Sequence, residues 1–217
     1  MLTKNTKKNK LLYIYEERIP IRLRELVLSF LPVEEFDIDS MTYNTPDSEK
    51  AKKFEWADLV LFAPGRFLSE EVLSHARNVK LMQLWSSGYD KFNTAGCAKF
   101  GIAVANNGGA NACSVAEHTV LLMLAVYKKL PDSHHRTVTG TWAGNNHGLD
   151  MFLLHGKRLG LVGFGNIGRQ VARKVSGFDM EVVYFDKNRT DEQTEKKHKA
   201  RFVDLDTLLK TSDIISL

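Results

Sequence analysis

The 217-residue sequence is poor in cysteine and contains no long apolar run. Its two cysteines, Cys97 and Cys113, are too few for a disulfide framework or a cysteine metal cluster. We expect both to pack as small hydrophobic residues. No apolar stretch approaches the ~20 residues that a membrane-spanning helix needs. These absences argue against a disulfide-stapled secreted domain and predict a cytoplasmic protein in a reducing compartment.

The net charge of +4 is unevenly distributed along the chain. Residues 1–10 contain four lysines and no acidic residue, and the rest of the chain balances 26 basic against 26 acidic side chains. This neutral body argues against a basic nucleic-acid surface. The basic tail at 1–10 also lacks the apolar stretch of a signal peptide. An apolar content of 43% is that of a globular protein, which excludes general disorder.

Apolar runs of strand length alternate with helical patterns through residues 11–105. The expected strands cover 11–15, 57–62, 79–84 and 102–105. The expected helices cover 19–31, ended by Pro32, 70–76, capped by Ser69, and 92–100, ended by Gly101. This alternation predicts a parallel sheet with helices on both faces, and therefore the α/β class.

A second series of elements follows a break at residues 106–109. One long helix is expected over 113–129, with Pro131 ending it. The helix is apolar over more than one stripe, so we expect it to be buried between domains or subunits. Beyond it we expect a loop at 137–151, a nucleotide unit from about Leu153, strands at 200–203 and 213–217, and a short helix at 206–210.

The sequence Gly163-Phe164-Gly165-Asn166-Ile167-Gly168 stands between an apolar strand and a helical pattern. In such a turn Gly163 permits a tight bend, Gly165 lets backbone approach a pyrophosphate, and Gly168 lets the helix pack closely on the strand. The backbone N–H groups of Asn166, Ile167 and Gly168 then open the helix toward an anion. A glycine motif alone is also found in surface loops. A strand, a glycine turn and a helix in this order predict a dinucleotide-binding βαβ unit.

An acidic residue completes this pattern. A second apolar strand at 182–185 ends on Asp186, eighteen positions after the last glycine. A carboxylate there can accept hydrogen bonds from both ribose hydroxyls, and its charge repels a 2′-phosphate, which favours NAD over NADP. Arg189 lies close by and argues in the other direction. A Rossmann protein that uses S-adenosylmethionine or flavin is a weaker alternative, because it leaves residues 81–117 unexplained.

Residues 81–117 carry further motifs in a fixed order. They are a Ser-Gly-Tyr-Asp turn at 87–90, a strand at 101–106, and a segment from Asn111 to His118, with Gly140-Thr141-Trp142 following later. Together with the glycine turn, these motifs resemble the D-isomer-specific 2-hydroxyacid dehydrogenases. That family includes D-3-phosphoglycerate, glyoxylate/hydroxypyruvate, D-lactate and formate dehydrogenases. The resemblance covers residues 57–217 well and 11–56 loosely.

The resemblance implies roles for individual residues. The turn at Ser87 and Gly88 would offer backbone N–H groups to the substrate carboxylate, and Asn111 would contact substrate. Two simpler interpretations stay open, because Ser87 and Gly88 can form only a turn and Asn111 can be only a helix N-cap. Val115 would line the nicotinamide ribose. The implied cofactor site therefore consists of Gly163, Gly165, Asn166, Ile167, Gly168, Asp186 and Val115.

Other polar residues resemble catalytic groups by type alone. Glu117 and His118 are helix residues in the family pattern, and we expect structural roles for them. His134 and His135 are adjacent on the chain, and we expect a solvated pair rather than a metal site. No metal is expected.

The architecture implied by the resemblance has two parts. A flavodoxin-like substrate domain at 11–105 precedes an NAD-binding Rossmann domain at 106–217 that is incomplete at its C-terminus. The family's catalytic Arg, Glu/Asp and His follow the strand that here ends at Leu217. No catalytic residue is therefore assigned within this chain, and we expect a truncated form that is inactive alone.

The activity implied by the resemblance is that of an NAD-dependent oxidoreductase. It would transfer hydride between NAD(H) and a small 2-hydroxy or 2-keto acid. A homodimer is implied for the complete protein, without nucleic-acid or membrane partners. The alternative is a non-catalytic NAD-binding sensor or corepressor-like module of the same fold.

Overall fold

The computed structural model describes residues 8–63, 67–141 and 148–217. The chain divides into two compact units, Met1–Ala110 and Asn111–Leu217, and each is described by itself. This division falls a few residues beyond the boundary predicted after residue 105. Most of the predicted basic tail and Trp142 of the Gly-x-Trp motif lie outside the described residues.

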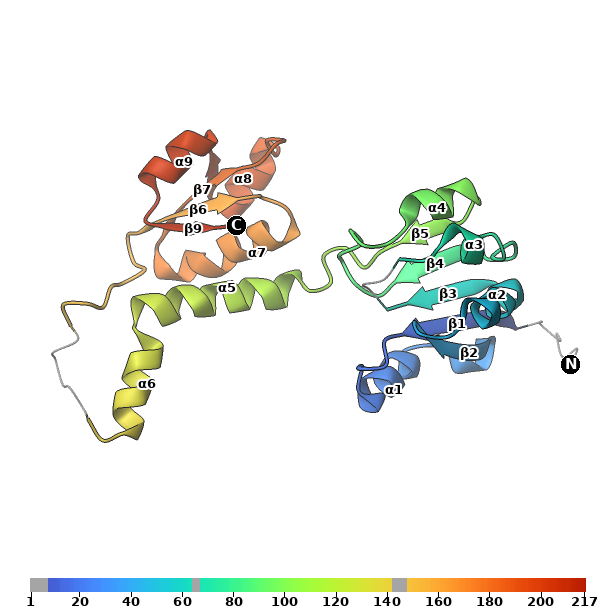
Figure 1. Cartoon of the computed structure of the whole chain (residues 1–217). Helices are drawn as coiled ribbons and strands as arrows, with labels where there is room; N and C mark the ends of the chain where they lie inside the picture. The colour runs from blue at the N-terminus through green and yellow to red at the C-terminus, as the bar shows by residue number, and fades with distance from the viewer. Residues whose placement is uncertain (1–7, 64–66, 142–147) are drawn as a thin grey trace, which may run out of the picture. The chain divides into compact units, whose positions relative to one another are not determined.

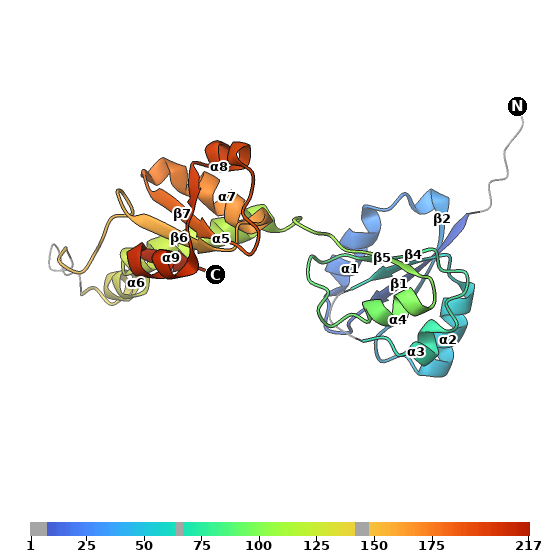
Figure 2. The same ribbon diagram turned by 90° about the horizontal axis from the view of Figure 1, so that it is seen from above.

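The first unit is a five-stranded parallel sheet with helices on both faces (Figure 1). Its spatial order is β2-β1-β3-β4-β5, the flavodoxin-like order, which confirms the predicted α/β class. Figure 2 shows α1 on one face of the sheet and α2, α3 and α4 on the other. The strands are β1 (Asn9–Tyr15), β2 (Phe36–Thr42), β3 (Leu59–Phe62), β4 (Leu81–Leu84) and β5 (Ala103–Ala105). The helices are α1 (Ile21–Ser29), α2 (Asp47–Trp56), α3 (Glu70–Leu73) and α4 (Thr94–Lys99).

Side chains of the central strands are divided between two apolar layers. Successive residues of a strand point to opposite faces. Leu12 and Ile14 of β1 therefore join the core under α2, α3 and α4, whereas Leu11 and Tyr13 join the cluster under α1. A parallel strand that is covered on both faces needs apolar residues at consecutive positions. This requirement explains why the sequence shows an unbroken apolar run at 11–15.

The sequence prediction missed β2 and α2. β2 is one of the two edge strands of the sheet and alternates apolar residues with exposed ones such as Asp37. α2 is mostly charged and fully buries only Phe54. An edge strand pairs on one side, and this surface helix relies on a single deep apolar contact. Neither element therefore produces the long apolar run from which the other elements were predicted.

The second unit is a four-stranded parallel sheet in the order β8-β7-β6-β9. The long helix α5 and α7 share one apolar cluster with the sheet, and α9 packs on the opposite face (Figure 1, Figure 2). The strands are β6 (Arg158–Val162), β7 (Glu181–Phe185), β8 (Ala200–Phe202) and β9 (Ile214–Ser216). The helices are α5 (Ala112–Tyr127), α6 (Leu130–Val138), α7 (Asn166–Val175), α8 (Glu192–His198) and α9 (Leu205–Thr211).

The sequence prediction missed α6, which fills the unassigned segment after the long helix and extends into the first two residues of the loop predicted at 137–151. Lys129 adopts a left-handed conformation with φ of 50° and ends the previous helical segment. Pro131 lies in the first turn of α6, where its missing N–H removes no helical hydrogen bond. Proline thus begins the next helix here. Among the described residues, no helix is long and apolar enough to cross a membrane.

Ion pairs connect the four strands of the second unit near their amino-terminal ends. Glu181 of β7 accepts from Arg158 of β6 at 2.8 Å and from Arg201 of β8 at 3.1 Å. Asp213, just before β9, lies 3.3 Å from Lys157 and accepts the backbone N–H of Arg158 at 2.8 Å. The Arg158 hydrogen bonds lower the pKa of both acids, so both are ionised at neutral pH. We name these five residues the amino-end ion cluster.

Candidate functional site

The glycine turn joins β6 to α7. Gly163 has φ of +104°, a conformation that glycine alone adopts without strain. Its N–H donates to the carbonyl of Phe185 at 2.7 Å, which connects the turn to the end of β7. The tight bend that we predicted at this position is therefore present in the backbone.

Gly168 and Gly165 differ in what surrounds them. A Cβ built on Gly168 would overlap the carbonyl oxygen of Gly163 and lie 3.3 Å from its carbonyl carbon. The first turn of α7 can therefore approach the strand end only because residue 168 has no side chain. A Cβ built on Gly165 meets nothing within 4 Å, so the space beside this residue is open. The turn consequently has one glycine for close packing and one for access to its backbone.

The first turn of α7 offers hydrogen-bond donors at this open position. The N–H groups of Asn166, Ile167 and Gly168 have no acceptor four residues earlier within the helix. The helix dipole adds partial positive charge at the same end. An anionic group such as a pyrophosphate is therefore the ligand class that this geometry fits.

Asp186 lies beside the same turn, at the end of β7. Its Oδ2 accepts the backbone N–H of Phe164 at 2.8 Å, and its Oδ1 accepts that of Asn188 at 3.4 Å. The Phe164 N–H is the main cause of a lowered pKa for Asp186, so the carboxyl is ionised at neutral pH. The glycine turn and the acidic residue, which we predicted as parts of one nucleotide-binding pattern, are thus joined by a direct hydrogen bond.

An aromatic stack supports the turn from within the unit. The buried ring of Phe164 stacks on Tyr184 with centroids 4.1 Å apart, and His198 meets it edge-on at 6.0 Å. The carbonyl of Phe164 also accepts from Nε of Arg169 at 2.9 Å. The variable second position of the glycine motif is therefore a packing anchor here. The sequence prediction missed this role, although an aromatic residue between two glycines is a possible signal for it.

The start of α5 carries two further predicted residues. Asn111 occupies the N-cap position without a side-chain capping hydrogen bond, and its carbonyl accepts from the N–H of half-buried Val115 at 2.9 Å. Glu117, one turn on, pairs with Lys174 of α7 at 2.9 Å, and this hydrogen bond lowers the pKa of Glu117. Glu117 therefore connects two helices, which is a structural contact of the kind we expected.

The two cysteines differ in their surroundings. Cys97 is buried, as predicted, and burial raises the pKa of its thiol to about 11. Cys113 is exposed at the start of α5, with its Sγ 3.7 Å from a carboxylate oxygen of Glu117. The prediction that Cys113 packs as a small hydrophobic residue was wrong, because the first turn of α5 presents it to solvent.

In the first unit, the predicted substrate turn follows β4 and is tied to the segment after β5. Nδ2 of Asn106 donates to the carbonyl of Ser87 at 2.7 Å, and the Ser87 hydroxyl donates to the carbonyl of Asn107 at 2.8 Å. The N–H of Asn107 donates to the carbonyl of Ser86 at 2.9 Å. A Cβ built on Gly88 meets nothing within 4 Å. The turn is therefore held through two of its carbonyl groups and the Ser87 hydroxyl, and it is open beside Gly88.

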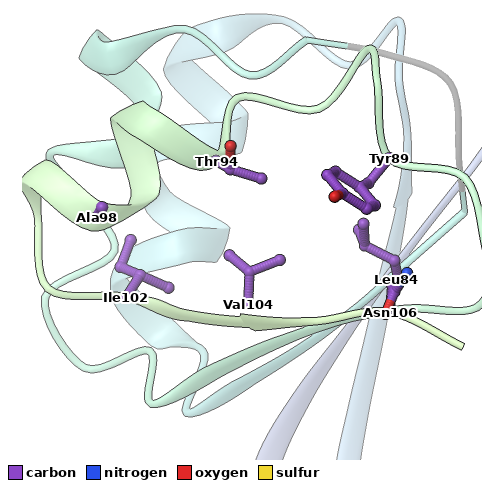
Figure 3. Close-up of a pocket in the computed structure, with 7 residues that line it drawn as sticks. All are labelled: Leu84, Tyr89, Thr94, Ala98, Ile102, Val104 and Asn106. Atoms are coloured by element: carbon purple, nitrogen blue, oxygen red, sulfur yellow. The ribbon is translucent and has the colours of Figure 1, made fainter. Parts of the chain in front are cut away.

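A pocket of about 380 Å³ adjoins this turn (Figure 3). Asn106 and Tyr89 contribute to it from the turn region, and Thr94 contributes from α4. Figure 3 shows Ala98 and Thr94 on the helix facing Ile102 and Val104 of the strand segment across the opening. Most of the lining residues are apolar, and Tyr89, Thr94 and Asn106 are the polar residues among them.

Asn106→Ala is expected to loosen the Ser87 turn, because it deletes the side-chain hydrogen bond to the Ser87 carbonyl. One such hydrogen bond contributes about 0.5–1.5 kcal/mol, so amide exchange in 86–88 should accelerate about threefold to tenfold. Hydrogen–deuterium exchange of peptides covering this turn measures the effect. Asn107→Ala is the control, since Asn107 contacts the turn through its backbone. Equal exchange in both variants would show that the Asn106 amide does not hold the turn.

The predicted site residues fall in both units. Ser87 and Gly88 belong to the first unit, and all other predicted residues belong to the second. Within the second unit, the glycine turn, the start of α7 and Asp186 are brought together by direct contacts. Asn111 and Val115 lie on the first turn of α5, a helix that packs along α7. Sequence reasoning missed Asn106 and Phe164, which hold the two turns in place.

The sequence of this chain is similar to those of known proteins. Residues 120–217 match the family model for the D-isomer specific 2-hydroxyacid dehydrogenase, NAD binding domain. The chain is 36% identical over 155 residues to a glyoxylate reductase of Thermococcus litoralis, a match that covers 69% of this chain and 46% of that protein. It is 35% identical over 162 residues to a hydroxypyruvate reductase of Thermotoga maritima, a match that covers 74% of this chain and 50% of that protein. The chain thus spans about half the length of these curated relatives.

The solved structures support the same fold. The apo D-mandelate dehydrogenase of Rhodotorula graminis superposes with a TM-score of 0.77 at 23% identity, covering 97% of this chain and 66% of that chain. The PH0520 protein of Pyrococcus horikoshii gives a TM-score of 0.71 at 26% identity, covering 96% of this chain and 61% of that chain.

Proposed function

Because this chain belongs to the D-isomer-specific 2-hydroxyacid dehydrogenase family, we propose that it supplies the cofactor site and the carboxylate-binding turn of an NAD-dependent oxidoreductase. The cofactor of the matched domain is NAD. The reaction is hydride transfer between NAD(H) and a small 2-hydroxy or 2-keto acid. When bound, NAD supplies the hydride acceptor and NADH the donor.

The observation that carries this proposal is the hydrogen bond between Asp186 and the backbone of Phe164. It places an ionised carboxylate beside a turn whose donors suit a pyrophosphate. A carboxylate at the end of the second strand suits ribose hydroxyls. The turn and the carboxylate thus suit two parts of one dinucleotide, the pyrophosphate and a ribose. The open space beside Gly165 leaves room for a phosphate at the turn.

Within this proposal the remaining site residues act by position. Asn166, Ile167 and Gly168 hold the pyrophosphate through backbone N–H groups, Gly163 supplies the bend, Gly165 leaves the backbone accessible, and Asp186 accepts from the ribose. Val115 lines the nicotinamide ribose. Ser87 and Gly88 offer N–H groups to the substrate carboxylate, and Asn111 contacts the substrate. No residue of this chain is assigned the acid–base role.

We further propose that the complete protein is a homodimer in which α5 and α6 contribute to the interface. Five large apolar side chains on these helices are exposed on the chain. They are Leu121, Leu122 and Val126 of α5, and Leu130 and Val138 of α6. Exposed apolar groups on neighbouring helices are typical of surfaces that a partner covers.

Isothermal titration calorimetry with NADH tests the proposed cofactor site. The chain is expected to bind NADH saturably, and Asp186→Ala is expected to weaken binding about tenfold to a hundredfold. That range corresponds to the loss of one charge-assisted hydrogen bond of about 1.5–3 kcal/mol. Asp186 also holds the Phe164 N–H, so part of this loss comes from a loosened turn.

Asp191→Ala is the matched control, because it removes the same charge a few residues along the loop. Asp191 caps α8 by accepting the N–H of Thr194 at 2.8 Å. Its replacement should leave the NADH dissociation constant within about twofold, since a single exposed charge contributes little at this range. A folded chain that does not bind NADH, or equal losses in the two variants, would contradict the assignment of Asp186.

A further inference from the structure

Arg189 lies on the loop that leaves β7, three positions after Asp186. An arginine on this loop can accommodate the 2′-phosphate that distinguishes NADP from NAD. The planar guanidinium suits phosphate because it donates two parallel hydrogen bonds. The position of Arg189 therefore favours NADP, whereas Asp186 favours NAD.

In this structure the guanidinium of Arg189 is engaged by another group. Its Nε donates to Oε1 of Glu195 at 2.9 Å, and its Nη2 donates to Oε2 at 3.0 Å. The guanidinium carbon also lies 5.7 Å from the ring centroid of Phe202 in β8. The two donors that could form a bidentate contact with a phosphate are therefore already paired with the Glu195 carboxylate. The side chain of Arg189 is still 58% exposed, so a phosphate could reach it in place of Glu195.

Glu195 is fixed in place from the sheet. Its side chain is only 12% exposed, and its Oε1 also accepts the hydroxyl of Tyr184 at 2.8 Å. Tyr184 is fully buried in β7, and its hydroxyl accepts the N–H of Thr190 at 3.2 Å. The hydrogen bond from Arg189 lowers the pKa of Glu195, so the carboxylate stays charged at neutral pH. A buried tyrosine thus orients the acid that holds the loop arginine.

The other charged groups of the loop have different roles. Asp191 accepts both the N–H and the hydroxyl of Thr194 and caps α8. Lys187 is exposed next to Asp186 and is the second cation of this loop. Asp186 carries negative charge beside the turn. Among these groups, Arg189 is the one whose phosphate-binding geometry is taken by an internal carboxylate.

We propose that Glu195 is a specificity-determining positioning residue that, together with Asp186, makes this site select NAD over NADP by sequestering Arg189. This inference rests on the proposed dinucleotide site. Asp186 repels a 2′-phosphate directly. Glu195 acts through Arg189, because a guanidinium paired with a carboxylate cannot present the same donors to a phosphate. The preference for NAD then depends on an acid that lies nine positions after the ribose-binding one.

The test compares dissociation constants for NADH and NADPH, measured by isothermal titration calorimetry on the full chain. Glu195→Gln removes the negative charge and keeps an acceptor for Tyr184. It is expected to tighten NADPH binding about tenfold, the contribution of one charge-assisted hydrogen bond of about 1.5 kcal/mol. NADH binding should stay within about twofold. Adding Arg189→Ala to Glu195→Gln should remove the gain, whereas adding Lys187→Ala should retain it.

Two single variants keep the proposal falsifiable. Tyr184→Phe disturbs the same cluster without removing the ion pair, so it should lower stability without tightening NADPH binding. Arg189→Ala alone should leave NADPH binding unchanged, because the arginine is already engaged. A loss of NADPH affinity in Arg189→Ala would show that Arg189 contacts the phosphate despite Glu195 and would overturn the proposal.

The outcomes also separate this inference from the proposed function. If the unaltered chain binds no NADH, the dinucleotide site itself is wrong. If it binds NADH normally, but Glu195→Gln leaves the NADPH constant unchanged or gains affinity without Arg189, only the role of Glu195 is overturned. Thermal unfolding of each variant shows whether a lost signal reflects lost fold.

Discussion

Gly168→Ala is expected to abolish measurable NADH binding and to destabilise the second unit. The added methyl would overlap the carbonyl oxygen of Gly163, and a backbone carbonyl in a tight turn cannot move aside as a flexible side chain can. Overpacking of this kind costs about 1–3 kcal/mol. The start of α7 would shift, and the loss of two backbone hydrogen bonds to an anion corresponds to at least about a hundredfold in affinity. Chemical denaturation and calorimetric NADH titration measure the two effects.

Gly165→Ala is the matched variant for this prediction, because the same methyl enters the same turn. A Cβ at residue 165 meets no atom within 4 Å, and φ of −77° is open to alanine. Stability should change by less than about 0.5 kcal/mol. NADH affinity should still fall, because the methyl occupies the space through which backbone approaches a phosphate.

Gly160→Ala is expected to lower stability without changing NADH affinity, the opposite of Gly165→Ala. Its Cβ would lie 2.7 Å from a methyl group of Leu208, within the sheet and away from the turn. This variant should lose stability while the molecules that remain folded bind NADH normally. If Gly165→Ala bound NADH as tightly as the unaltered chain, the glycine turn would not be the phosphate site.

Phe164→Ala is expected to produce the second large effect, a loss of about 3–5 kcal/mol of stability. The ring is 2% exposed and fills the space between Tyr184 and His198 under the turn. Its removal leaves a cavity in the cluster that joins α7 to the sheet. Because the backbone N–H of residue 164 holds Asp186, NADH binding should weaken as well. Thermal or chemical unfolding measures the first effect, and calorimetry the second.

Phe152→Ala makes the same chemical change at an exposed site of the same unit. Phe152 is 55% exposed and meets Tyr127 edge-on at 6.0 Å. Its loss should cost about 1 kcal/mol or less, the value of one exposed aromatic contact. Similar losses in the two variants would mean that Phe164 does not anchor the turn.

Much of the fold could be predicted from sequence because its central elements are buried on both sides. A strand such as 11–15 is apolar at consecutive positions, and a glycine turn between a strand and a helix has few other uses. The edge strand β2 and the charged helix α2 could not be predicted in this way, since each buries too little to show a pattern. α6 was missed because Pro131 can either end a helix or begin one, and the left-handed Lys129 decides between them.

The candidate site was predictable in its backbone parts and less so in its side chains. Gly163, Gly168 and Asp186 follow from a spacing that the geometry of a nucleotide-binding unit requires. Asp186 accepts the backbone N–H of Phe164, and the residue type at position 164 does not indicate that its backbone makes this contact. The pairing of Arg189 with Glu195 depends on a loop and a helix that meet only in the folded unit. Contacts of this kind follow from the folded structure and cannot be inferred from residue spacing.

The amino-end ion cluster and the candidate site lie at opposite ends of the strands of the second unit. Parallel strands give a sheet two unlike rims, and here charged side chains fasten the strands to one another at the first rim. The glycine turn and Asp186 occupy the second rim. The ion pairs between the strands and the proposed dinucleotide site therefore use different residues. A change of charge at Lys187 or Arg189, in the loop after β7, would therefore leave the ion pairs between the strands in place.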